Sequence, residues 1–181
     1  MISLKSKIAQ KLLAFYFLNP HESLYVNELA RRLAADKRNL VKKLRELELG
    51  GLLASEKKGN LRLYGVNRKF PLYKEYERIV LKTIGVEENL KQMLKSLPGV
   101  KEAYLYGSYA QEKMGVHSDL DLLVIGSHQI VVLQKKLISL QHEIGREVNA
   151  VNMSEDEFGR RRAKKDPFLS GILERKTIRL V

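Results

Sequence analysis

Two aspartates in the second half of the chain have the spacing of a cation site. Asp119 and Asp121 are separated by one residue and run into the apolar segment 122–125, which is typical of a buried β-strand. Residues i and i+2 of a strand point to the same face, so both carboxylates can offer oxygen ligands to hard cations such as Mg²⁺. For an isolated Asp-x-Asp, capping at the start of the strand is the alternative.

A glycine–serine pair upstream of the aspartates favours the first of these interpretations. Gly107 and Ser108 directly follow a predicted strand, 100–106, and precede a segment that is expected to open a helix. A turn of this kind at a helix N-terminus presents backbone N–H groups and a hydroxyl to a phosphate chain. Together with the aspartates, the pair indicates a site for a phosphate chain and Mg²⁺.

The segment 107–124 resembles the minimal branch of the DNA-polymerase-β-type nucleotidyltransferase superfamily, whose hallmark is Gly-Ser followed by Asp-x-Asp on a strand at this spacing. The ending 166–173, with Asp-Pro-Phe-Leu followed by Ile-Leu, also resembles that branch. The resemblance covers roughly residues 85–181 and implies a mixed α/β nucleotidyltransferase-fold domain.

This resemblance also implies an activity and roles for the residues. A nucleoside monophosphate would pass from a nucleoside triphosphate (NTP) to an acceptor hydroxyl, and Gly107 and Ser108 would hold the triphosphate. Asp119 and Asp121 would be the metal-binding and catalytic carboxylates, with two Mg²⁺ ions if the protein is active.

One position departs from the pattern of the superfamily, which places a third carboxylate on a later strand to bind metal and help activate the acceptor hydroxyl. The strand predicted at 147–152 has Asn149 at the aligned position, and an amide cannot act as a base. Glu147 lies two residues earlier on the same strand face and is the candidate catalytic substitute. A surface acid beside Arg146 is the alternative for Glu147, so the sequence leaves catalysis open.

Positive charge is concentrated in the first 70 residues. They hold 15 of the 33 Lys/Arg and six of the 21 Asp/Glu, a net charge of +9 out of +12 for the whole chain. This bias is the electrostatic footprint of a phosphate-binding domain, although a solvated basic surface would give the same count.

The segment 36–49 is the candidate recognition helix of this basic region. Asp36 is expected to cap it, and Gly50 with Gly51 to end it. Leu44 and other apolar residues fall on one side of the helix. The other side and its edges carry the candidate DNA-binding residues Arg38, Asn39, Lys42, Lys43 and Arg45. Arg and Lys suit guanine edges and phosphates, and Asn suits adenine.

A basic hairpin is predicted after this helix. Its strands are expected at 52–56 and 61–66, and the Gly-Asn pair between them permits a tight turn. The candidate DNA-binding residues here are Lys57, Lys58 and Arg62, which are expected to touch backbone phosphate beside the groove.

Two earlier helices, expected at 4–18 and from an Asn27 N-cap through Leu33, complete this domain. It resembles the winged-helix family of transcription regulators in its element order and in the segments 26–33, 39–47 and 50–53. The resemblance implies double-stranded DNA as partner, and a homodimer, because winged helices often bind palindromes as two-fold dimers. A winged helix used only for dimerisation or protein contact is the alternative.

The sequence therefore predicts an α+β chain with a winged helix (three helices plus a hairpin wing) over 1–70, a linker helix over 71–84 and a nucleotidyltransferase-like domain over 85–181. The absence of cysteine excludes disulfides and thiolate zinc sites, and no segment approaches the roughly 20 apolar residues that span a bilayer. These observations favour a soluble cytoplasmic protein with no membrane partner.

The function favoured by the sequence is that of a DNA-binding transcription regulator whose nucleotidyltransferase domain binds Mg-NTP. The alternative is an active transferase that moves a nucleoside monophosphate to a protein or RNA hydroxyl. The resemblance also implies a role as the antitoxin of a toxin–antitoxin pair, with a helical toxin as partner protein.

Overall fold

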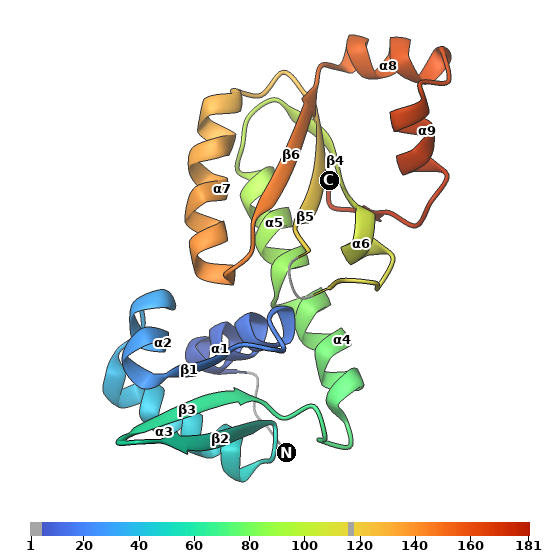
Figure 1. Cartoon of the computed structure of the whole chain (residues 1–181). Coiled ribbons are helices and arrows are strands. Elements are labelled where there is room, and N and C mark those ends of the chain that lie inside the picture. Colours follow the sequence, from blue (N-terminus) through green and yellow to red (C-terminus); the bar gives the residue numbers. More distant parts are fainter. Residues whose placement is uncertain (1–4, 116–117) are drawn as a thin grey trace. The chain divides into compact units, whose positions relative to one another are not determined.

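The computed structural model describes residues 5–115 and 118–181. The chain divides into two compact units, Met1–Glu88 and Asn89–Val181, each with its own sheet (Figure 1). The expected α+β class is confirmed, since helices and sheets occur in both units. Within the described residues, no helix combines the length and the apolar character that a membrane crossing requires.

The first unit has the element order that the sequence predicts, three helices and a hairpin followed by a further helix. Its elements are α1 (Lys7–Leu18), β1 (Ser23–Tyr25), α2 (Val26–Arg32), α3 (Lys37–Leu49), β2 (Leu53–Lys58), β3 (Leu61–Val66) and α4 (Tyr73–Thr83). The strands form an antiparallel sheet in the order β1-β3-β2. The core lies between this sheet and the helices, and its largest fully buried side chains include Tyr16 and Phe15 of α1.

The ends of α3 follow the sequence prediction, whereas the start of α2 does not. The Asp36 carboxylate accepts a hydrogen bond of 2.9 Å from the backbone N–H of Asn39, and Gly50 is the C-cap. Asn27 is not the N-cap of α2, because the helix begins at Val26 and Tyr25 precedes it without a side-chain cap. Tyr25 is the last residue of β1, so the chain passes from strand to helix without the loop residue that an Asn cap needs.

The hairpin formed by β2 and β3 is longer than predicted. Its ladder continues through the pair Lys58↔Leu61, so both lysines lie in β2 and not in a loop. Gly59 adopts a φ of 61°, which allows the two-residue turn Gly59-Asn60 to close the ladder directly.

The segment expected as a linker forms α4, which packs within the first unit. Tyr73 and Val80 are buried in its core, and the Tyr73 ring lies 5.4 Å from that of Phe17. The division between the units falls at Glu88, inside α5 (Val86–Lys95).

The second unit is built on a four-stranded sheet. After α5 it contains β4 (Val100–Tyr106), α6 (Gly107–Ala110), β5 (Leu120–Gly126), α7 (Ile130–Ile144), β6 (Val148–Met153), α8 (Glu155–Ala163), α9 (Pro167–Leu173) and β7 (Ile178–Arg179). The strand order is β6-β5-β4-β7, with β5 and β6 parallel and the other pairs antiparallel. Figure 1 shows α5 and α7 along one face of the sheet and α8 and α9 on the other.

The side chains of β5 alternate between these two faces. Leu123 and Ile125 pack against Phe158 of α8 and Leu169 of α9. Because alternate residues of a strand share a face, Asp121 lies on the same face of the sheet as Leu123 and Ile125. Farther along β5, α8 and α9 cover this face.

Candidate functional site

A glycine turn and a carboxylate are in direct contact at the start of β5. Tyr106, the last residue of β4, lies opposite Asp121 in the antiparallel ladder, and Gly107 begins α6 immediately afterwards. Gly107 has a φ of 70°, and a Cβ atom built on it would lie 2.1 Å from Asp121 Oδ2. Only glycine therefore fits here, both because of the backbone conformation and because the carboxylate occupies the space of a side chain.

The two aspartates meet an amide from the neighbouring strand. Asp119 precedes β5, and Asn149 lies opposite Asp121 in the parallel pair of β5 and β6. The side-chain Nδ2 of Asn149 donates a hydrogen bond of 3.1 Å to Asp119 Oδ2. The structure thus brings together Gly107, Asp119, Asp121 and Asn149, which come from three separate segments of the chain.

The charges of this cluster oppose one another in the absence of a cation. Partial burial, and secondly the negative charge of Asp119, raise the pKa of Asp121 above its ordinary value. Burial and the charge of Asp121 raise the pKa of the Tyr106 hydroxyl as well. A bound cation would relieve the repulsion, and carboxylate and amide oxygens are the ligands that Mg²⁺ prefers.

The turn after β4 is held by its own short helix. Ser108 lies half-buried in α6, and its backbone carbonyl accepts a hydrogen bond of 2.9 Å from Lys113. Tyr109 and Ala110 are buried and anchor the turn in the unit. Ser108 is therefore placed next to the residue that contacts Asp121.

Glu147, the candidate third carboxylate, is exposed and lies immediately before β6. Its backbone carbonyl accepts a hydrogen bond of 2.9 Å from Leu120, which ties the starts of the two parallel strands together. Among residues 5–115 and 118–181, no three His, Cys, Asp or Glu side chains are grouped as a metal site. The side chain that the structure joins to the acidic pair is Asn149.

Arg146 is a further residue near this site whose role the sequence does not reveal. Its Nη1 donates to the backbone carbonyls of Ser118, at 3.2 Å, and Gly115, at 3.4 Å. It therefore contacts the backbone of two residues that precede Asp119. No sequence pattern indicates this contact, because it joins residues about 30 positions apart.

The exposed side of α3 is cationic. Leu40, Leu44 and Leu47 are completely buried beneath it. Four of the candidate DNA-binding residues of this helix are exposed, namely Arg38, Asn39, Lys42 and Arg45. Lys43 differs from these four, because it is partly covered and forms an ion pair with Glu46 of the same helix.

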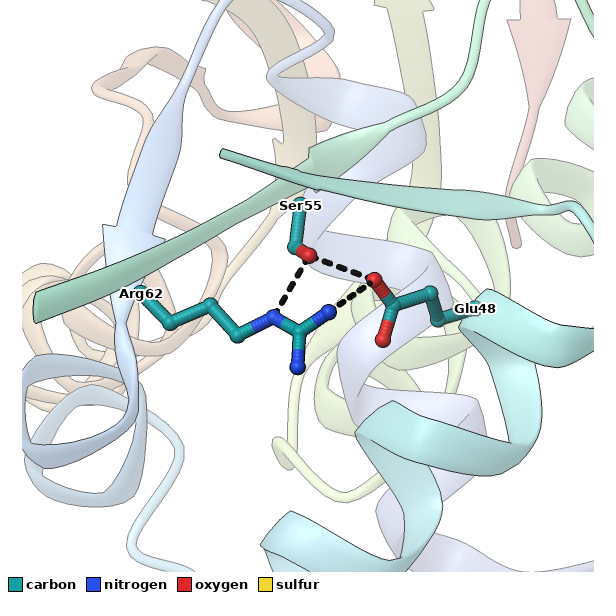
Figure 2. Close-up of polar contacts among 3 residues, drawn as sticks. All are labelled: Glu48, Ser55 and Arg62. Carbon is teal, nitrogen blue, oxygen red and sulfur yellow. Dashed lines mark hydrogen bonds and ion pairs between the residues drawn. The ribbon is translucent and has the colours of Figure 1, made fainter. Parts of the chain in front are cut away.

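The three basic residues of the hairpin have different surroundings. Lys57 and Lys58 are exposed near the turn. Arg62 of β3 instead forms an ion pair of 2.9 Å with Glu48 of α3, and its Nε donates to Ser55 Oγ of β2 at 2.7 Å (Figure 2). Arg62 lies opposite Lys57 in the β2–β3 ladder, and its guanidinium is directed at Glu48 and Ser55.

Solved structures of low similarity include two toxin–antitoxin proteins and a regulator. A toxin–antitoxin with AMP-PNP is 23% identical over 36% of this chain and 56% of its own, with a TM-score of 0.33. A mutant of the toxin–antitoxin MntA-HpeT is 16% identical over 53% and 73%, with a TM-score of 0.40. The adhesin competence repressor AdcR from Streptococcus pyogenes is 18% identical over 49% and 66%, with a TM-score of 0.35.

These scores do not establish a shared overall fold, and the chain spans little more than half of the AMP-PNP-bound protein. No curated protein matches the chain. The family model described as "Polymerase beta, Nucleotidyltransferase" matches residues 88–165, which include the glycine turn, both aspartates and Asn149. Residues 88–165 are therefore similar to this family of nucleotidyltransferases.

Proposed function

We propose that this protein binds duplex DNA through a winged helix in its first unit and Mg-NTP through its nucleotidyltransferase domain, and that it acts as a transcription regulator. The observation that carries the DNA-binding part is the exposed cationic side of α3, with Arg38, Lys42 and Arg45 above a row of fully buried leucines. A helix that packs through one side and presents cations and an amide on the other suits the major groove.

Lys57 and Lys58 extend this cationic surface onto the hairpin, where backbone phosphates would lie. A homodimer would present two such surfaces to the halves of a palindromic site. Multi-angle light scattering of the free protein and of its DNA complex tests this part of the proposal.

The contact between Gly107 and Asp121 supports the nucleotide-binding part. The glycine allows the Asp121 carboxylate to lie directly against the turn, so a phosphate chain held at the turn and an Mg²⁺ held by Asp121 would be adjacent. Asp119 and Asp121 would hold the metal, and Gly107 with Ser108 would hold the phosphates. When bound, Mg²⁺ would neutralise the triphosphate and the paired carboxylates.

An active nucleotidyltransferase is the second candidate, and the complete Gly-Ser turn and aspartate pair favour it. The acceptor would be a protein or RNA hydroxyl, and Glu147 would supply the third carboxylate after a shift of the backbone before β6. A role as an antitoxin would add a helical toxin as partner protein. In this case the first unit would target the enzyme or mediate dimerisation.

Binding to duplex DNA is tested by fluorescence anisotropy with random and genomic duplexes at several salt concentrations. We expect log K to fall linearly with log salt, with a slope of about −0.9 for each phosphate contact. Absence of salt-dependent binding by the full chain would contradict the DNA-binding part. A variant with Arg38, Lys42 and Arg45 all replaced by Ala is the control for the surface.

Nucleotide binding and turnover are tested separately with ATP, GTP, CTP and UTP. Calorimetry with and without Mg²⁺ measures binding, and labelled nucleotides measure transfer to protein or RNA. The Asp119→Asn/Asp121→Asn double variant should lose the Mg²⁺-dependent binding. Label transfer that disappears in this variant would establish the transferase, whereas binding without transfer would leave a nucleotide-binding regulator.

A further inference from the structure

A polar cluster of the first unit joins three elements of the proposed DNA-binding surface. Arg62 of β3 reaches Glu48 near the end of α3 and Ser55 of β2, as Figure 2 shows. Ser55 Oγ also donates to the same Glu48 oxygen that accepts from Arg62. Each of the three side chains therefore contacts both of the others.

This cluster needs the planar fork of arginine. Nε is directed at the serine and Nη2 at the carboxylate, while the guanidinium carbon lies 5.7 Å from the centre of the Tyr64 ring. A lysine ammonium has the same charge but no such pair of fixed donors. The side chain of Glu48 is 24% exposed and that of Arg62 is 56% exposed, so this ion pair lies at the surface of the first unit.

We propose that Arg62 is a positioning residue, not a phosphate ligand, and that Glu48 and Arg62 together hold the hairpin on the end of α3. This proposal rests on the proposed DNA binding of the first unit. Because Glu48 neutralises Arg62, the guanidinium adds little to the attraction of DNA. Its effect is to keep Lys57 and Lys58 at a fixed place relative to the cations of α3.

This role is tested at two acidic residues of α3, Glu48 and Glu46, whose replacement should change DNA binding in opposite directions. Replacement of Glu48 by Ala removes a negative charge but also releases the hairpin, so DNA binding should weaken by about 3- to 10-fold as the lysine contacts are lost. Glu46 forms an ion pair with Lys43 of its own helix, so Glu46→Ala should free a cation and tighten DNA binding by about twofold. If Arg62 binds phosphate, both variants should bind DNA more tightly.

The experiment compares the full-length wild type with Glu48→Ala, Glu46→Ala, Arg62→Lys and Arg62→Ala. Salt-dependent DNA binding is one readout, and hydrogen exchange of the amides in residues 53–66 without DNA is the other. We expect Arg62→Lys to resemble Arg62→Ala in both, with exchange in the hairpin faster by at least about threefold. Glu48→Ala should show the same faster exchange, and Glu46→Ala should match the wild type.

The proposal is overturned if Arg62→Lys binds DNA with the affinity and the salt dependence of the wild type. It is also overturned if Glu48→Ala binds DNA more tightly and the magnitude of its slope of log K against log salt increases by about one. Unchanged exchange in the hairpin of Glu48→Ala and Arg62→Lys would also overturn it. If the wild type does not bind duplex DNA, the proposed function fails. The exchange measurement, which contains no DNA, would still decide whether Arg62 holds the hairpin.

Discussion

The amide of Asn149 donates a hydrogen bond to the carboxylate of Asp119 across two parallel strands, over 3.1 Å. The register of these strands also places Asn149 opposite Asp121. Asn149 is thus a neutral hydrogen-bond donor at a position where an acidic residue would add a third negative charge beside Asp119 and Asp121, which already repel each other. The amide thus satisfies one Asp119 oxygen without adding a charge to the cluster.

Replacement of Asn149 by Asp should convert the pair into a three-carboxylate site. We expect the metal-free protein to lose about 1 kcal/mol of unfolding free energy, because the hydrogen bond to Asp119 is replaced by repulsion. Mg²⁺ should restore this loss and bind about tenfold more tightly than to the wild type. Thermal unfolding with and without Mg²⁺ measures both effects.

Asn149→Ala is the matched control, since it removes the hydrogen bond without adding a charge. It should lose stability without any gain in Mg²⁺ affinity. Equal Mg²⁺ affinities in Asn149→Asp and the wild type would show that position 149 does not face the bound cation.

Replacement of Gly107 by Ala should disrupt the site and its unit. The new methyl group would lie 2.1 Å from Asp121 Oδ2, on a backbone with a φ of 70°. We expect a loss of about 2 kcal/mol or more in unfolding free energy, together with loss of Mg²⁺-dependent nucleotide binding. Urea unfolding and calorimetry measure the two losses.

Gly159 of α8 and Gly171 of α9 provide controls for this substitution. Apart from the adjacent residues and the backbone of the same helix, no described atom lies within 4 Å of the Cβ position at either residue. Each is helical, so replacement by Ala should raise the unfolding free energy by about 0.5–1 kcal/mol. A similar loss at all three glycines would argue against a specific contact at Gly107.

The stability of the second unit should depend on pH through Asp121. The pKa of this carboxyl is higher in the folded protein than in the unfolded chain, so the folded state retains the proton longer. The contribution to unfolding free energy is therefore present at low pH and falls as pH rises from the ordinary carboxyl range through the raised pKa.

Asp121→Asn should abolish this contribution, because an amide does not titrate. In urea unfolding without metal, we expect the variant to gain stability relative to the wild type as pH increases from about 4 to about 7. Mg²⁺ should reverse the order, since only the wild type has the carboxylate ligand. A difference between the two proteins that does not change with pH would contradict the prediction.

The exposed cations of α3 should contribute unequally to DNA binding. Lys42→Ala and Arg45→Ala should each reduce the magnitude of the slope of log K against log salt by about 0.9. Lys43→Ala should have a smaller effect, because Lys43 is already paired with Glu46. Lys135→Ala, an exposed site on α7 of the second unit, is the control and should leave the slope unchanged.

Local patterns in the sequence were enough to predict most elements of both units. The periodicity of Leu40, Leu44 and Leu47 predicts which side of α3 is buried, and Asp36 predicts where the helix begins. The apolar run after Asp121 likewise predicts β5. These features depend on residues a few positions apart, whose effect on the backbone does not require knowledge of the rest of the chain.

The tertiary structure decided which side chains meet. The contacts of Asn149 with Asp119, of Gly107 with Asp121 and of Arg62 with Glu48 span 14 to 30 positions in the chain. Strand register and the packing of a hairpin on a helix bring these groups together, and both are set by the burial of many apolar side chains at once. The sequence by itself therefore determined the elements and the kinds of chemistry that they carry, and only the folded core determined the partners of each charged group.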